Sequence, residues 1–341
     1  MTFSISRRSC GLVLLAGLLP AARAATAQPS PDGAPLVVYN AQHVSLTKAW
    51  IEAFTRETGI AVTMRSGGDT ELGNQIVQEG KASPADVFLT ENSPAMALVD
   101  NAGLFAPVAA DTLALVPPGF RPANGHWMGI AARSTVFAYN TSRLTTAQLP
   151  ASLLDLAAPH WKGRWAASPS GADFQAIVGA LLASRGEATT AAWLTAMKAN
   201  AVAYRGNGVA MKAVNAGEID GAVIYHYYWF GDQAKTGENS NHTALHYFRG
   251  QDPGAFVSLS GGGVLASSKR QPQAQAFLRW IAGQGGQNIL RTGDSFEYAV
   301  GLGAASHPKL EPLDKLQAPP INPSELNSRR VGELMIQAGL L

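Results

Sequence analysis

Apolar and polar residues alternate along this chain in a pattern that predicts strands and helices in turn. A first apolar strand is predicted over residues 36–39, followed by a helix whose apolar positions recur at helical spacing over residues 46–54. Ser45 is the expected N-cap of this helix, and Gly59 is expected to close it. The pattern then repeats, with a strand over residues 60–64, a helix over 71–79 and a strand over 86–89.

The later part of the chain continues this alternation. An apolar helical stripe runs over residues 174–182, and a buried strand is predicted over residues 221–223. The glycines at 261–263 are expected to form a flexible joint. Further elements are predicted as strands over 135–140 and 254–260, and helices over 207–217, 274–281 and 324–338. Strands that alternate with helices imply an α/β fold with a mainly parallel sheet, in which ligands bind beyond the carboxyl ends of the strands.

Two polar residues follow such strand ends. His43 comes just after the first strand, and Glu91 just after the third. Taken alone, a histidine there is more often a hydrogen-bonding loop residue, and a glutamate an ordinary helix-cap carboxylate. Arg65 and Arg133 could line the cleft, but a solvated role or one that braces the lobes is the more common use of such arginines.

An aromatic stretch follows the strand at 221–223. Tyr225, His226, Tyr227 and Tyr228 occupy four consecutive positions. Neighbouring residues of a regular strand point to opposite faces, so Tyr227 and Tyr228 can reach one ligand only if the backbone leaves the strand there. An aromatic rim that caps the sheet is the more common use of such a pair.

Ser170, Gly171 and Ala172 precede the helical stripe at 174–182 and are therefore placed at a helix N-terminus. Free N–H groups and the helix dipole favour an anion at such a position. The commoner role of this serine is an N-cap, and Asp173 in the first turn could itself occupy the field. The glycines at 261–263 are not a phosphate loop, because no Lys-Ser or Lys-Thr follows them.

The N-terminus has the composition of a secretory signal over residues 1–24. Arg7 and Arg8 supply positive charge, an apolar centre follows at 12–19, and small residues at 22–24 provide a cleavage site. Export by the general or the twin-arginine route remains open. Residues 25–34 are expected to be a flexible leader, and the mature chain should be soluble and located outside the cytoplasm.

Composition narrows the class of protein further. A chain of 341 residues with 46% hydrophobic content, 35 Gly and 20 Pro fits a loop-rich α/β protein with two lobes. Cys10, the only cysteine, lies within the signal, so the mature chain cannot form disulfides. Loss of the three signal-peptide arginines takes the formal net charge from +2 to −1, which gives no electrostatic reason to expect nucleic acid as a partner.

From about Val38 to Leu340 the sequence resembles the periplasmic ferric-iron-binding proteins of ABC importers, the bacterial transferrins. The resemblance is carried by residues 39–43, 83–88 with Glu91, 170–172, 217–220, 227–229 and 252–255. It implies a two-lobed periplasmic-binding-protein fold of type II-like organisation, with the ligand cleft between lobes joined by crossing strands. We expect residues 35–133 plus 261–300 to form lobe 1, and residues 134–260 plus 301–341 to form lobe 2.

The resemblance also implies a site and a role. His43, Glu91, Tyr227 and Tyr228 would be the protein ligands of Fe³⁺. A small synergistic anion, phosphate or carbonate, would be held by Ser170, Gly171, Ala172 and Asn207. The chain would be a monomeric periplasmic receptor, not an enzyme, that delivers iron to an inner-membrane ABC permease.

The chemistry of these side chains agrees with ferric iron. Fe³⁺ is a hard cation, matched by phenolate and carboxylate oxygens, whereas soft metals would require thiolates that the mature chain lacks. Free tyrosine has a pKa near ~10, so a strong local positive charge is needed to make it a phenolate at neutral pH. Two phenolates and one carboxylate cancel the charge of Fe³⁺ and leave room for an anion or water.

The sequence departs from the family pattern at two positions. Tyr225 stands where the family often has an asparagine, and Asp173 replaces a usually apolar residue. Both changes fall on the anion side of the site, where Tyr225 could act as a third phenolate or close the pocket.

Two other classes of function compete with the iron receptor. The same fold could bind an oxyanion or a small organic ligand of the phosphonate or thiamine type, which the helix N-terminus at Ser170 favours. An extracytoplasmic enzyme with a tyrosine-ligated iron is the third class. Four strong protein ligands count against it, because catalytic metals usually keep an open substrate position.

Overall fold

The computed structural model describes residues 1–2, 33–323 and 325–341. Most of the predicted signal peptide and leader therefore lies outside the described residues. The strands are β1 (Leu36–Asn40), β2 (Val62–Ser66), β3 (Val87–Leu89), β4 (Trp127–Asn140), β5 (Trp165–Ala167), β6 (Ala201–Ala203), β7 (Gly221–Tyr225), β8 (Thr243–His246) and β9 (Val257–Val264). The helices are α1 (Val44–Thr58), α2 (Asp69–Glu79), α3 (Ser93–Asn101), α4 (Ala110–Leu113), α5 (Ala172–Asn200), α6 (Asn207–Asn215), α7 (His226–Lys235), α8 (Gln271–Ala282), α9 (Gln284–Thr292) and α10 (Ser328–Gln337).

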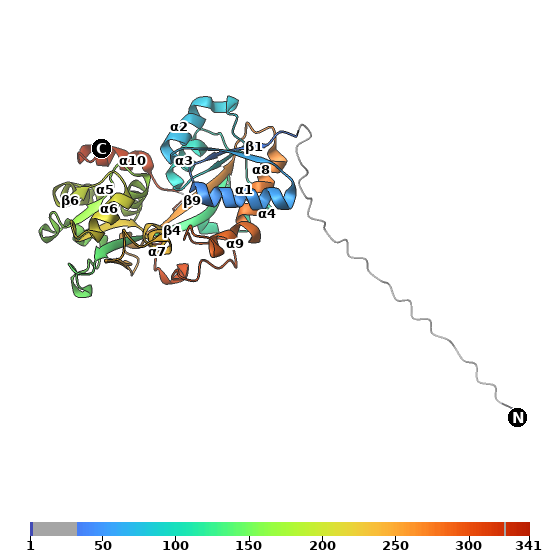
Figure 1. The fold of residues 1–341 in the computed structure, drawn as a ribbon. Helices are drawn as coiled ribbons and strands as arrows, with labels where there is room; N and C mark the ends of the chain where they lie inside the picture. Colours follow the sequence, from blue (N-terminus) through green and yellow to red (C-terminus); the bar gives the residue numbers. More distant parts are fainter. Residues whose placement is uncertain (3–32, 324) are drawn as a thin grey trace.

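The strands form one continuous mixed sheet with the order β2-β1-β3-β9-β4-β7-β5-β6, and β8 pairs with β4. The β1–β2, β1–β3, β5–β6 and β5–β7 pairs are parallel, whereas β4 and β9 run antiparallel to their neighbours. Figure 1 shows two bodies of helices packed around the two ends of this sheet, with β4 and β9 passing between them. This arrangement confirms the predicted α/β fold with crossing strands.

The long strand β4 joins the two bodies. Its first half, over residues 127–134, pairs with β9, and its second half, over residues 135–139, pairs with β7. All of its side chains are buried, so the crossing strand is part of the core. Only the second half was predicted, because its neighbours at 127–134 do not alternate and lie after a proline-rich passage.

We propose that the lobes divide as expected, at residues 133/134 and 260/261 on the crossing strands. Helix α10 packs against α5 in the second body, as Figure 1 shows. The backbone N–H of Leu302 donates to the carbonyl of Leu115 in the first body at 2.8 Å, so we propose that the third boundary lies after Leu302 and not at the expected 300/301. Among the described residues, no helix combines the length and the apolar character needed to cross a bilayer.

The expectation that residues 261–263 form a flexible joint is wrong. All three glycines lie inside β9 and are buried. A Cβ at Gly261 would lie 2.3 Å from Met96 Cγ, and one at Gly263 would lie 2.7 Å from the ring of Phe105. These glycines allow close packing of side chains over the crossing strand, which a pattern of residues along the chain does not reveal.

We expect Gly263→Ala to lower the free energy of unfolding by about 1–3 kcal/mol, because the added methyl group must displace the Phe105 ring. Urea unfolding of the iron-free protein measures this. Gly332→Ala is the control, since a Cβ at that helical position meets nothing within 4 Å and should be neutral or stabilising. A Gly263→Ala protein as stable as the wild type would favour the flexible joint instead.

Candidate metal centre

Three parallel strands deliver polar residues to one edge of the sheet. β1 ends at Asn40 and leads to His43, β2 leads to Asp69, and β3 leads to Glu91 and Asn92. This is the placement expected at the carboxyl ends of parallel strands.

His43, not Ser45, is the N-cap of α1. The turn before the helix is held by Asn40, whose side-chain amide donates to the Gln42 carbonyl at 2.7 Å and whose Oδ1 accepts from Thr47 at 2.8 Å. The helix therefore begins earlier than its apolar pattern indicates. As a result, the His43 side chain lies at the N-terminus of α1 and faces the other lobe.

The second lobe supplies the tyrosines. β7 ends at Tyr225 and α7 begins at His226, so the backbone leaves the strand where the sequence required it. In the first turn of α7 the rings of Tyr227 and Tyr228 stack, with centroids 4.3 Å apart. Both hydroxyls point toward Asp173 Oδ2, at 3.4 Å from Tyr227 and 3.1 Å from Tyr228.

The two lobes meet at this point. The ring of His43 lies edge-on to that of Tyr227 with centroids 4.6 Å apart, and His43 Nε2 is 3.1 Å from Glu91 Oε1. The expected ligand set of His43, Glu91, Tyr227 and Tyr228 therefore converges across the cleft. Among the described residues, His, Cys, Asp and Glu alone form no group of three suited to a metal ion.

Asp173 lies at the junction of the two lobes and is buried. Besides the two tyrosine hydroxyls, it accepts hydrogen bonds from the amides of Asn207 at 2.9 Å and Asn92 at 3.0 Å. Asn92 belongs to lobe 1, whereas Asp173 and Asn207 belong to lobe 2. The carboxylate of Asp173 is therefore the acceptor that links both halves of the site.

The expected anion residues are arranged differently from the expectation. α5 begins at Ala172 with Gly171 as N-cap, so the serine N-cap at Ser170 is wrong; Ser170 is exposed. The N–H of Gly171 donates to the Ser168 carbonyl at 3.0 Å. The Asn207 amide already binds the carboxylate of Asp173. A protein carboxylate thus lies in the field of this helix N-terminus.

Tyr225 supports the same carboxyl residue. It is fully buried, and its hydroxyl lies 3.2 Å from the backbone carbonyl of Asp173 and 3.5 Å from Asn92 Oδ1. The hydroxyl is thus used in the contact between the lobes. Of the two roles considered for Tyr225, this geometry favours closing the pocket over a third phenolate.

Arg133 is not solvated, so that one of its expected roles is wrong. It is completely buried on β4, where Nη2 donates to Glu297 Oε2 at 2.8 Å and to Ser260 Oγ at 2.6 Å. Its Nη1 is 3.6 Å from Glu91 Oε2, and its guanidinium lies 5.4 Å from the centroid of the Tyr227 ring. A buried positive charge therefore lies close to two of the expected ligands, Glu91 and Tyr227.

The protonation states follow from burial and these charges. Burial and the charge of Asp173 raise the pKa of Tyr227 well above 10, and that of Tyr228 in the same direction, so both are phenols in the iron-free protein. Burial alone would lower the pKa of His43, but Glu297 and Glu91 raise it to about 10. Burial and the charge of Glu91 raise the pKa of Asp69, which accepts from the Glu91 N–H, to about 7.

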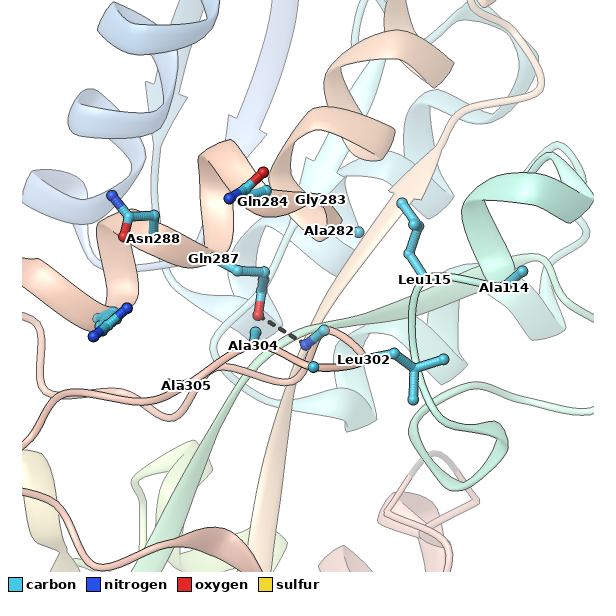
Figure 2. A pocket seen from close by; sticks show the side chains of 13 residues that line it. Ala114, Leu115, Ala282, Gly283, Gln284, Gln287, Asn288, Leu302, Ala304 and Ala305 are labelled. Atoms are coloured by element: carbon cyan, nitrogen blue, oxygen red, sulfur yellow. Dashed lines mark hydrogen bonds between the residues drawn. The ribbon is translucent and has the colours of Figure 1, made fainter. Parts of the chain in front are cut away.

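Two openings flank the site. A cavity of about 590 Å³ is lined by His43, Tyr227 and Tyr228, and one of about 290 Å³ by Glu91, Asp173 and Tyr228. A third cavity, of about 380 Å³, lies elsewhere, between α9 and residues 301–305 (Figure 2). Its lining contains no carboxylate, histidine or tyrosine, so it offers no ligands to a hard cation.

Sequence reasoning missed several residues of the site. Asn92 and Asp69 follow strand ends, so the rule that placed His43 and Glu91 could have found them. The sequence indicated Asp173 as a competitor for the anion position and as a departure from the family pattern, but not as a residue that joins the two lobes. Glu297 lies in an irregular segment and carries no local signal.

The fold, the crossing strands and the cleft define a two-lobed solute-binding protein. Residues 82–323 match the family model of bacterial extracellular solute-binding proteins, and the chain belongs to this family. It is 66% identical to the Fe(3+)-binding periplasmic protein of Serratia marcescens, over 97% of each chain.

A further relative and a solved structure are also described as iron-binding or iron-bound proteins. The major ferric iron-binding protein of Neisseria meningitidis serogroup B is 36% identical over 98% of this chain and 99% of its own. Among solved structures, iron-bound HitA from Pseudomonas aeruginosa superposes with a TM-score of 0.85 at 40% identity, and the match covers 90% of this chain and 99% of that one. The resemblance to periplasmic ferric-iron-binding proteins is thereby confirmed.

His226 generates a prediction for pH dependence. It is fully buried: Nε2 lies 2.7 Å from the Phe296 carbonyl, and Nδ1 accepts from the Ser134 N–H at 3.2 Å. Burial lowers its pKa from 6.5 to about 4, so the folded chain favours the neutral ring. The resulting stability is present above pH 6.5 and is lost as the pH falls toward 4.

We therefore expect the free energy of unfolding of the iron-free wild type to fall between pH 7.5 and pH 5 by about 2 kcal/mol more than that of His226→Gln. Glutamine can retain one donor and one acceptor but does not titrate. Urea unfolding at both pH values measures the difference. Equal pH slopes for the two proteins would contradict the assignment of a neutral buried ring.

Proposed function

We propose that this protein captures Fe³⁺ between its two lobes in the periplasm and delivers it to an inner-membrane ABC permease. The observation that carries the proposal is the convergence of His43 and Glu91 from one lobe with Tyr227 and Tyr228 from the other. The names of the most similar relatives, which describe ferric-iron binding in the periplasm, support the same function.

The donor set suits a hard trivalent cation. It consists of one imidazole nitrogen, carboxylate oxygens and two phenol oxygens, and it contains no sulfur. Because Tyr227 and Tyr228 are phenols in the iron-free protein, each must lose its proton to bind as a phenolate. The charge of Fe³⁺ makes that loss favourable, and the buried Arg133 beside Tyr227 contributes in the same direction.

We further propose that Asp173 takes the place of the external synergistic anion. Its carboxylate, from the first turn of α5, already accepts from Tyr227, Tyr228 and Asn207. A free anion at Ser170, Gly171, Ala172 and Asn207 would meet this negative charge at close range. With Asp173 as a ligand, the protein supplies five of the roughly six donors that Fe³⁺ takes, and water can supply the rest.

Because its ligands come from both lobes, a bound metal ion would hold the two lobes together. An ion bound by His43 and Glu91 alone would leave the tyrosines unused, so Fe³⁺ binds the closed form more tightly than the open one. That differential affinity drives closure, which is the form a receptor presents to its transport partner. The signal sequence at 1–24 and a monomeric mature chain fit this role.

The competing functions fit this site less well. An oxyanion or small organic ligand would have to share the cleft with the buried carboxylate of Asp173. An iron enzyme needs an open coordination position, whereas five protein donors suit sequestration. We therefore propose a transport protein and not an enzyme.

Ferric salt should give the purified protein the visible colour of phenolate-to-iron charge transfer. Tyr227→Phe and Tyr228→Phe should each lose most of this absorbance and bind Fe³⁺ at least about 100-fold more weakly, since a strong anionic ligand is removed. Tyr247→Phe, a change at a half-buried tyrosine outside the ligand set, is the control and should keep both. A wild-type protein that stays colourless with ferric salt would rule out the proposal.

The role of Asp173 has a separate test. In buffers stripped of phosphate and carbonate, the wild type should bind Fe³⁺ fully, and added phosphate should not raise the affinity. Asp173→Ala removes the carboxylate and opens space before α5, so its binding should be weaker by about 10–100-fold and should be restored in part by phosphate. A wild type that requires an added anion would show that Asp173 does not replace it.

A further inference from the structure

Glu297 lies in the chain's irregular passage after α9, yet its side chain is completely buried beside the metal centre. Its Oε2 accepts from Arg133 Nη2 at 2.8 Å and Gln42 Nε2 at 3.2 Å, and Ser260 Oγ is 3.1 Å away. Three donors therefore fix one oxygen of this carboxylate. The other oxygen is left to face the site.

That second oxygen faces His43. Glu297 Oε1 makes no hydrogen bond elsewhere in the described part of the chain, and it lies 2.9 Å from His43 Nδ1. On the opposite side of the imidazole, Nε2 is 3.1 Å from Glu91 Oε1. A carboxylate beside Nδ1 accepts a hydrogen bond from the N–H of that nitrogen and leaves Nε2 as the nitrogen that can give up its proton and bind a metal.

The backbone that carries Glu297 is held from both lobes. Tyr298 pairs with Ala132 on β4 through two hydrogen bonds, of 2.8 and 3.0 Å. The carbonyl of Phe296 is 2.7 Å from Nε2 of His226, the first residue of α7. Phe296 adopts a positive φ of 52°, which a bulky residue rarely does, so the surrounding contacts impose this turn.

We propose that Glu297 is the positioning residue of His43: it holds the imidazole through its Nδ1–H and directs Nε2 to the metal position beside Glu91. Arg133, Gln42 and Ser260 act through Glu297 by fixing its other oxygen. Glu297 itself does not contact the metal. The inference rests on the proposed iron site and adds to it the residue that sets the orientation of its histidine.

The test uses Glu297→Gln in the full mature chain. If the amide oxygen stays with Arg133, its NH₂ group faces Nδ1 as a donor, so Nδ1 loses its proton and the ring keeps the proton on Nε2, the metal-binding nitrogen. Fe³⁺ affinity, measured by competition with citrate and followed by the visible absorbance, should fall by about 10–100-fold while the phenolate colour at saturation remains. In the iron-free protein, the ¹⁵N spectrum of the His43 ring should lose its Nδ1–H signal.

Two further variants make the result decisive. Glu297→Asp keeps the charge that pairs with Arg133 but withdraws the carboxylate from His43, so it should show a smaller loss of affinity and a weakened Nδ1–H signal. Tyr298→Phe, from the same segment, removes a hydroxyl that is not among the groups that hold the Glu297 carboxylate and should match the wild type. Thermal unfolding of each iron-free variant shows whether it is folded.

If Glu297→Gln does not fold, the Fe³⁺ affinity and the Nδ1–H signal of Glu297→Asp test the inference instead. Wild-type affinity together with an unchanged Nδ1–H signal in the folded variant would overturn the inference. A wild type that binds no Fe³⁺ would instead refute the proposed function, and the iron-free ¹⁵N spectra would still report whether Glu297 holds the His43 proton.

Discussion

A single buried carboxylate, that of Asp173, joins the two halves of this molecule. A charge removed from water needs hydrogen-bond donors, and Asp173 finds them on both lobes, in Asn92 on one side and in Asn207 and the tyrosines on the other. Asn92 reaches the carboxylate from the other lobe, whereas Asn207 and the two tyrosines lie on the same lobe as Asp173. The crossing strands β4 and β9 matter because they let the N-terminus of α5 approach the carboxyl ends of β1 and β3.

A second buried charge, that of Arg133, organises the opposite side of the site. It binds Glu297 directly and stands close to Glu91 and the ring of Tyr227. Negative ligands gathered in a small volume repel one another, and a fixed positive charge behind them reduces that repulsion before any metal arrives. The proposed site is thus preorganised by ionic contacts made within the core of the crossing strands.

The two departures from the family pattern lie next to each other in space. The hydroxyl of Tyr225 is within hydrogen-bond distance of the carbonyl of Asp173, and both residues contact Asn92. In the proposed site, Asp173 supplies the negative charge that an external anion would bring, and Tyr225 fills the space beside it. The expectation of a separate anion set at Ser170, Gly171, Ala172 and Asn207 followed from the resemblance, whereas the aspartate in the first turn of this helix already indicated a competitor for the same position.

The sequence alone predicted the α/β fold and the order of most elements, because strand ends are local signals. It also placed His43 and Glu91 after strands and Tyr227 and Tyr228 after a buried strand, but only the resemblance to ferric-iron-binding proteins implied that these four residues bind a metal. It could not determine the first half of β4, which is buried on every side and does not alternate. Nor could it place Arg133 and Glu297, which pair with each other although they are 164 positions apart in the chain. Only the tertiary structure decided these features, since a buried charge is stabilised by partners that folding brings together and not by its neighbours in sequence.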